Sequence, residues 1–249
     1  MSGPPRDRDH PASRDADRAQ GEPDNRAGES ETEAAATGGC RRRLGTLSIA
    51  LIVALLLLWL GPELWTRPPR PDPTGVFPGF ADAEGILPVF DHPTRDRANA
   101  PIAVFVEESE DALELHVLFP DEDHPLALLD RWYDLYRGAF RWKRVADLES
   151  FRLELGPVKS GESRPIRRVI FPGSHAGEQG YGPWLARHHR RAVDVPKAGP
   201  RPLVIEIRTW NHLFAVAGEP GPKTTMTRVR PPVFRATRAE VEAWLQPRR

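Results

Sequence analysis

The longest apolar run of the chain extends from Leu44 to Leu60 and contains no charged residue. As a helix, these seventeen residues would be about 25 Å long, near the lower limit for crossing a hydrocarbon core about 30 Å thick. Arginines occupy positions 41–43 before the run, and no Ala-x-Ala cleavage pattern follows it. A buried core helix and a cleaved signal peptide are the alternatives. Because the neighbours are polar and proline-rich and the polar lead is long, residues 44–60 are predicted to be a transmembrane anchor.

The flanking charges predict the orientation of this anchor. The arginines at positions 41–43 adjoin its amino-terminal end, whereas Arg67 and Arg70 stand further from the other end and are partly offset by Glu63. Positively charged flanks stay on the cytoplasmic side of a membrane. We therefore expect a single-pass protein of the cell membrane, with a cytoplasmic amino terminus and an extracytoplasmic carboxyl-terminal part. Its expected partners are the lipid bilayer and other envelope or membrane proteins.

The polar segments on either side of the anchor differ in character. Residues 1–43 mix arginine with acidic residues and contain almost no large apolar side chain, so they are expected to be a disordered tail. Residues 61–100 are rich in proline and glycine, which predicts an extended tether. Residues 101–249 remain for folding, which is about the length of one domain.

Alternation of apolar and polar positions predicts the strands of this domain. Residues 113–119 carry an apolar side chain at every second position, and the apolar run 102–106 precedes them. The polar segment between the two favours an antiparallel hairpin. Further strands are expected at 147–155, 168–171, 203–207 and 213–217.

Apolar residues at a spacing of three to four predict the helices. One is expected to begin at Pro125, capped by Asp123 or His124, and to present an apolar face as far as residue 140. A short helix is expected at 183–192. The last begins at Thr237, where Glu240 completes a capping box. Because strands and helices are interspersed without a regular βαβ period, the predicted fold class is α+β with a mainly antiparallel sheet.

Overall charge and cysteine content exclude several classes of function. The chain has 35 basic and 35 acidic residues, so no global positive field attracts nucleic acid. Its single cysteine, Cys40, precedes the anchor, where it is either an inert thiol or a site of acylation. The predicted outer domain therefore has no disulfide, no thiolate metal site and no cysteine nucleophile.

Acidic residues and histidines gather at the expected strand ends. They include Asp121 after the second strand, Asp147 and Glu149 in the next, His175 in a glycine-rich segment and His212 before the last strand. Carboxylate oxygens and neutral imidazole nitrogens are ligands for Zn²⁺, Mn²⁺ or Ca²⁺. Helix capping and turn formation are the alternative explanation, because no H-E-x-x-H spacing is present.

Two other segments contain residues that could take part in chemistry. Residues 173–177 (GSHAG) resemble a nucleophile elbow, but the serine is not central between the glycines, which favours a flexible loop. Residues 188–191 (HHRR) lie close to Trp184 and form either a patch for phosphate or lipid headgroups or a solvated helix face.

The order of four short segments resembles that of necrosis-inducing (NPP1-type) and Vps62-like domains. The segments are 119–122 (FPDE), 147–149 (DLE), 174–177 (SHAG) and 211–213 (NHL). In the NPP1-type toxins, acidic and histidine positions hold a divalent metal near a lipid-headgroup surface. The resemblance therefore implies Asp121, Asp147, Glu149, His175 and His212 as metal ligands. Ala146 and Leu148 stand where the family has histidine and tryptophan.

Two functions follow from these observations. The first is a membrane-anchored domain that binds a ligand or partner at the cell envelope without catalysis, because no complete catalytic motif is present. The alternative is a metal-dependent domain that binds or hydrolyses lipid headgroups, because acidic residues and histidines cluster at the strand ends.

Overall fold

The computed structural model describes residues 48–57, 70–82, 85–137, 146–157, 164–196 and 202–246. Residues 48–57, within the predicted anchor, are helical. Across the described ranges, no helix combines the length and the hydropathy that a membrane crossing needs. The predicted tail at 1–43, with Cys40, lies outside these ranges, as does the first part of the predicted tether, 61–69.

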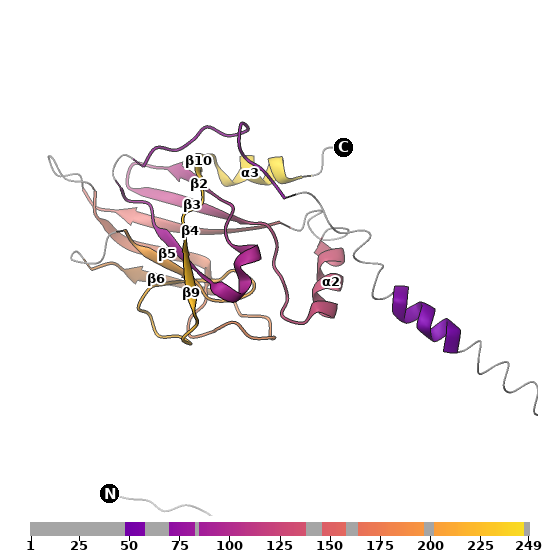
Figure 1. Ribbon diagram of the computed structural model, residues 1–249. Helices are drawn as coiled ribbons and strands as arrows, with labels where there is room; N and C mark the ends of the chain where they lie inside the picture. The colour runs from indigo at the N-terminus through magenta and orange to yellow at the C-terminus, as the bar shows by residue number, and fades with distance from the viewer. Residues whose placement is uncertain are drawn as a thin grey trace, which may run out of the picture. The chain divides into compact units, whose positions relative to one another are not determined.

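Ten strands form one curled sheet (Figure 1). In chain order they are β1 Val89–Pro93, β2 Ala103–Glu108, β3 Ala112–Phe119, β4 Asp147–Leu155, β5 Ile166–His175, β6 His189–Asp194, β7 Val204–Ile207, β8 Phe214–Val216, β9 Met226–Val229 and β10 Val233–Arg235. The 3₁₀ helix η1 (Thr94–Asn99) follows β1, α2 (Ala127–Tyr136) follows β3, and α3 (Arg238–Leu245) follows β10.

The strand order makes the sheet curl toward closure. The order is β10-β2-β3-β4-β5-β8-β7-β1-β9, with β6 paired to β5. Strands β9 and β10 stand at opposite ends of this order, yet only Arg230-Pro231-Pro232 separates them in the chain. The two ends of the sheet must therefore lie near each other. Six of the nine strand pairs are antiparallel, in agreement with the predicted α+β class.

Strand β3 supplies side chains to two apolar cores. Its alternate residues Leu113, Leu115, Val117 and Phe119 are buried in the larger core, together with Phe151 and Phe214. Leu118 faces the other way, into a smaller core with Phe105 and Val241 of α3. Successive residues of a strand point to opposite faces of the sheet, so β3 contributes apolar side chains to both cores.

Several predicted elements are confirmed. Strands β2 and β3 pair as an antiparallel hairpin, and β4 spans the predicted residues 147–155. The capping box of α3 is complete: the Glu240 N–H donates to Thr237 Oγ1 over 3.3 Å, and the Thr237 N–H donates to Glu240 Oε2 over 2.7 Å.

Other expectations were wrong. Residues 183–192 contain no helix, because 189–194 form β6 along β5. The loop expected at 173–177 instead begins as the end of β5. Strand β1 and η1 lie inside the expected tether 61–100, because pairing with β7 and β9 compensates for a proline-rich sequence. Helix α2 starts two residues after Pro125, and its N-cap is Leu126 without a side-chain hydrogen bond.

Candidate metal centre

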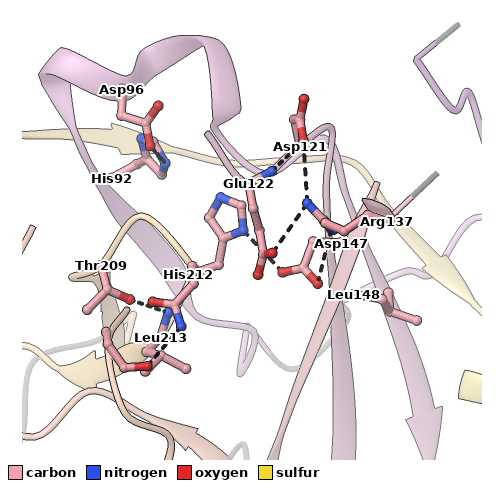
Figure 2. Close-up of polar contacts among 12 residues, drawn as sticks. His92, Asp96, Asp121, Glu122, Arg137, Asp147, Leu148, Thr209, His212 and Leu213 are labelled. Carbon is pink, nitrogen blue, oxygen red and sulfur yellow. Dashed lines mark hydrogen bonds and ion pairs between the residues drawn. The ribbon is translucent and has the colours of Figure 1, made fainter. Parts of the chain in front are cut away.

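Three buried side chains converge where β1, η1 and the turn before β8 meet (Figure 2). His92 comes from β1, Asp96 from η1 and His212 from the turn that joins β7 to β8. One potential ligand atom from each lies within 4.8 Å of those from the other two. All three residues are less than 9% exposed, at 1%, 8% and 0% respectively. Two imidazoles and one carboxylate therefore share a small dry volume.

The other polar atom of each side chain already has a partner. His92 Nδ1 lies 3.2 Å from the Pro93 carbonyl oxygen, and His212 Nδ1 lies 3.1 Å from Asp147 Oδ2. Asp96 Oδ1 accepts a hydrogen bond from Asn99 Nδ2 over 2.8 Å. Because carbonyl and carboxylate oxygens accept hydrogen bonds, both histidines are assigned as the tautomer with the proton on Nδ1. The lone pair of each imidazole is then on Nε2.

These remaining atoms are buried without hydrogen bonds. Within the described part of the chain, His92 Nε2, Asp96 Oδ2 and His212 Nε2 have no hydrogen bond of ordinary geometry, and the nearby Tyr181 hydroxyl interacts with the Asp96 carboxyl group. His92 Nε2 and Asp96 Oδ2 are 3.7 Å apart. A buried polar atom left without a partner costs about 1–3 kcal/mol, so three of them in one place call for an explanation. A cation bound between them would provide it.

The pKa directions agree with a cation site. Burial, together with the neighbouring His212, lowers the pKa of His92 to about 4, so His92 is neutral at pH 7. Burial raises the pKa of Asp96. Both shifts disfavour charged forms in a dry environment, and a bound cation would favour the ionised carboxylate again.

The backbone at His212 is held in an unusual conformation. Its φ angle is 55°, and it is the one non-glycine residue with positive φ in the described ranges. The Leu213 N–H donates to Thr209 Oγ1 over 2.9 Å, which fixes the turn, and the imidazole stacks on the Phe119 ring with centroids 3.7 Å apart. Non-glycine residues in this region are strained, and such strain is concentrated at functional sites.

A second group of possible ligands shares His212 but already contains a cation. Glu122, Asp147 and His212 also bring ligand atoms within 4.8 Å of one another. The buried Arg137 guanidinium lies 3.3 Å from Glu122 Oε2 and 4.0 Å from Asp147 Oδ1. Figure 2 shows Arg137 reaching into this acidic cluster. The arginine supplies the positive charge here, and Asp147 serves chiefly to orient His212.

The acidic residues around Arg137 have raised pKa values. Burial raises the pKa of Asp121 to about 7 and that of Glu122 to about 8, although Arg137 acts in the opposite direction. The pKa of Glu149 is raised well above its usual value by burial and by the charges of Asp147 and Glu122. More carboxyl groups gather here than one guanidinium can neutralise.

Among the described residues, the five predicted ligands do not come together in one group. Asp147 and His212 are in contact, and Asp121 lies 3.5 Å from Arg137. His175 has separate partners: its Nε2 lies 3.4 Å from Glu219 Oε2, and its Nδ1 accepts the Gly177 N–H. Among the described residues, neither group of three includes Asp121, Glu149 or His175.

His92 and Asp96 were missed by sequence reasoning. Their spacing of four residues is visible in the sequence, but the segment reads as part of the proline-rich tether. Only the pairing of β1 with β7 brings His92 to the turn that carries His212. Comparison of the chain with protein-family profiles, curated proteins and solved structures gave no match.

Proposed function

We propose that the folded domain binds one divalent transition-metal ion through His92 Nε2, Asp96 Oδ2 and His212 Nε2. The observation that carries this proposal is the convergence of three buried residues, each of which brings one ligand atom within 4.8 Å of those of the other two and has one buried atom without a hydrogen bond. Histidine and carboxylate ligands suit Zn²⁺ and Fe²⁺. Three protein ligands leave coordination positions for water or an anionic oxygen, which is the chemistry of headgroup binding and of ester hydrolysis.

The surroundings of the three ligands support the same assignment. A histidine that binds a metal usually donates its other N–H to a carboxylate or a carbonyl oxygen. Asp147 and the Pro93 carbonyl have these roles for His212 and His92. The Arg137 guanidinium in turn lies 4.0 Å from Asp147 Oδ1, so a positive charge stands beside the carboxyl group that contacts His212. The site thus has both inner ligands and the outer groups that orient them.

The proposal joins this metal centre to a membrane. Residues 44–60 would anchor the chain, with the domain on the extracytoplasmic side, where it binds a ligand or a lipid headgroup through the metal. The uncharged run and the arginines before it support this placement. Resistance of the full chain to extraction by alkaline carbonate tests the anchor, because a span is released only by detergent.

The metal proposal is tested by measuring metal content in variants. The full chain is purified in detergent, stripped with a chelator and reloaded with Zn²⁺, and bound zinc is measured by mass spectrometry. We expect about one ion per chain, and loss of this ion in His92→Ala and Asp96→Asn, because each removes one ligand.

His175→Ala is the matched control, since His175 is also buried, at 2% exposure, but has other partners. It should retain the ion. Circular dichroism confirms that each variant is folded. Zinc bound equally by wild type and both ligand variants, or zinc lost only in His175→Ala, would overturn the proposal.

A further inference from the structure

Helix α2 packs against the domain through its polar face. The Tyr133 hydroxyl donates to Glu122 Oε2 over 2.9 Å, and Arg137, just after the helix, lies 3.3 Å from the same oxygen. Asp130 accepts a hydrogen bond from the His124 N–H. None of the helical residues is buried. This arrangement inverts the usual one, in which an amphipathic helix buries its apolar side.

The apolar face of α2 is consequently exposed. Leu128, Trp132 and Tyr136 follow one another at intervals of four, which places them on one side of a helix. They are 46%, 38% and 50% exposed, and the adjacent Leu129 is 52% exposed. The sequence predicted an apolar face on this helix, and the structure shows that it does not contribute to the described core.

A second exposed apolar segment lies beside this helix. Trp184 is 84% exposed and Leu185 is 65% exposed. Trp210, which is buried, connects the two: its Nε1 donates to the Trp184 carbonyl oxygen over 3.1 Å, and its ring contacts Tyr133 of α2 with centroids 5.8 Å apart. We call the residues Leu128, Leu129, Trp132, Tyr136, Trp184 and Leu185 the apolar patch.

Exposed cationic residues follow the Trp184-Leu185 part of this patch in the chain. Arg187 and Arg190 follow Leu185 in the chain, both are exposed, and no ion pair to a described residue is formed by either. His188 and His189 lie between them and are also exposed. Leucine, tryptophan and tyrosine next to arginine are the composition of surfaces that bind at the interface of anionic membranes.

We propose that the apolar patch inserts into the interfacial layer of an anionic phospholipid bilayer, with Arg187 and Arg190 at the headgroups. The predicted anchor ends at Leu60, ten residues before Arg70. Ten residues span at most about 35 Å, so an anchored chain would hold its domain close to the bilayer. Insertion by about 5–10 Å would bury the leucines and leave the aromatic rings at headgroup level. This docking does not depend on the metal centre.

The test uses the full chain with Cys40→Ser and one new cysteine, Leu129→Cys or Leu185→Cys, labelled with an environment-sensitive dye. The protein is reconstituted into phosphatidylcholine vesicles with or without phosphatidylglycerol, and spin-labelled lipids serve as quenchers. In the vesicles that contain phosphatidylglycerol, we expect a blue-shifted emission at both positions. The spin-labelled lipids should quench most of this fluorescence. Lys223→Cys, at an exposed position in the segment before β9, is the control and should show neither effect.

Each other outcome contradicts the proposal. Water-like emission without quenching at both patch positions would show that the patch does not meet lipid. A blue shift without lipid quenching would show that protein covers it, either another part of this chain or a second copy. Equal quenching in both vesicle types, unchanged by Arg187→Glu with Arg190→Glu, would overturn the role of the arginines. Asp96→Asn should leave quenching unchanged, so failure of metal binding is recognised separately.

Discussion

His212 links the backbone, the ring stack and both candidate ligand groups at one position. Its Nδ1 contacts Asp147, its side chain is grouped with those of His92 and Asp96, and its backbone has a positive φ. A substitution of His212 can therefore alter the stability of the fold through the backbone conformation, and metal binding through loss of the imidazole. Two substitutions that differ in their tolerance of positive φ separate these effects.

In the presence of chelator, both His212→Asn and His212→Val lose the stack on Phe119 and the imidazole contact with Asp147, and we expect His212→Val to be about 1–2 kcal/mol less stable than His212→Asn. Asparagine tolerates positive φ, but a β-branched side chain does not. Both variants should lose the metal. Urea unfolding of the stripped proteins measures the difference, and equal stability of the two variants would contradict the backbone argument.

Two of the residues singled out from the sequence, Asp147 and His212, contact each other in the structure, and their role as metal ligands stays a prediction. Asp147 begins β4 and His212 precedes β8, and both were predicted. Glu122 directly follows the predicted Asp121, yet only the structure shows that Tyr133 and Arg137 hold it. The partners of His92 could not be predicted, because they depend on pairing between segments more than 100 residues apart.

At the scale of elements, the sequence predicted the strands and helices that are marked by patterns among neighbouring residues. The apolar run at 102–106 identified β2, the period of two identified β3 and β4, and the Thr237–Glu240 pair identified the start of α3. Strands β9 and β10 were not predicted, because their sequences MTRV and VFR lack the apolar runs that mark the equally short β7 and β8. The exposed apolar face of α2 was unpredictable for another reason: the helix packs through polar contacts to Glu122 and to the His124 N–H, in the segment just before it, and the apolar period does not show these contacts.

The capping box of α3 gives a prediction of known size. Thr237→Ala removes the acceptor for the Glu240 N–H and should destabilise the domain by about 0.5–2 kcal/mol. The loss reaches the whole domain because Val241 of this helix is fully buried. Thr225→Ala, an exposed threonine outside the helices, is the control and should change the free energy of unfolding little. Equal effects of both changes in urea unfolding would contradict the role of the cap.

At the scale of the whole molecule, the buried titratable groups predict how stability depends on pH. Burial raises the pKa of Asp134 to about 8 and that of Asp121 to about 7, above the value near 4 of an unfolded chain. Such groups take up protons on folding, so stability falls as pH rises through the folded pKa. His92, with its lowered pKa, has the opposite effect below about pH 6.5.

Above pH 6.5, only the carboxyl groups with raised pKa values still change the stability with pH. The Tm of the metal-free protein should therefore fall between about pH 6.5 and 8.5. Asp134→Asn should make this fall shallower, because it removes one of the groups that release a proton on unfolding. Thermal unfolding followed by circular dichroism in chelator measures the slope. A Tm that is constant or rises over this range would show that these carboxyl groups are ionised in the folded protein.

The position of a bound ion tests the central claim most directly. Crystals of the protein loaded with one equivalent of Zn²⁺ would be measured on both sides of the zinc absorption edge. We predict a single anomalous peak, about 2.0–2.2 Å from Nε2 of His92, Nε2 of His212 and Oδ2 of Asp96. A peak beside Glu122 and Asp147 instead, or no peak within the domain, would contradict the account.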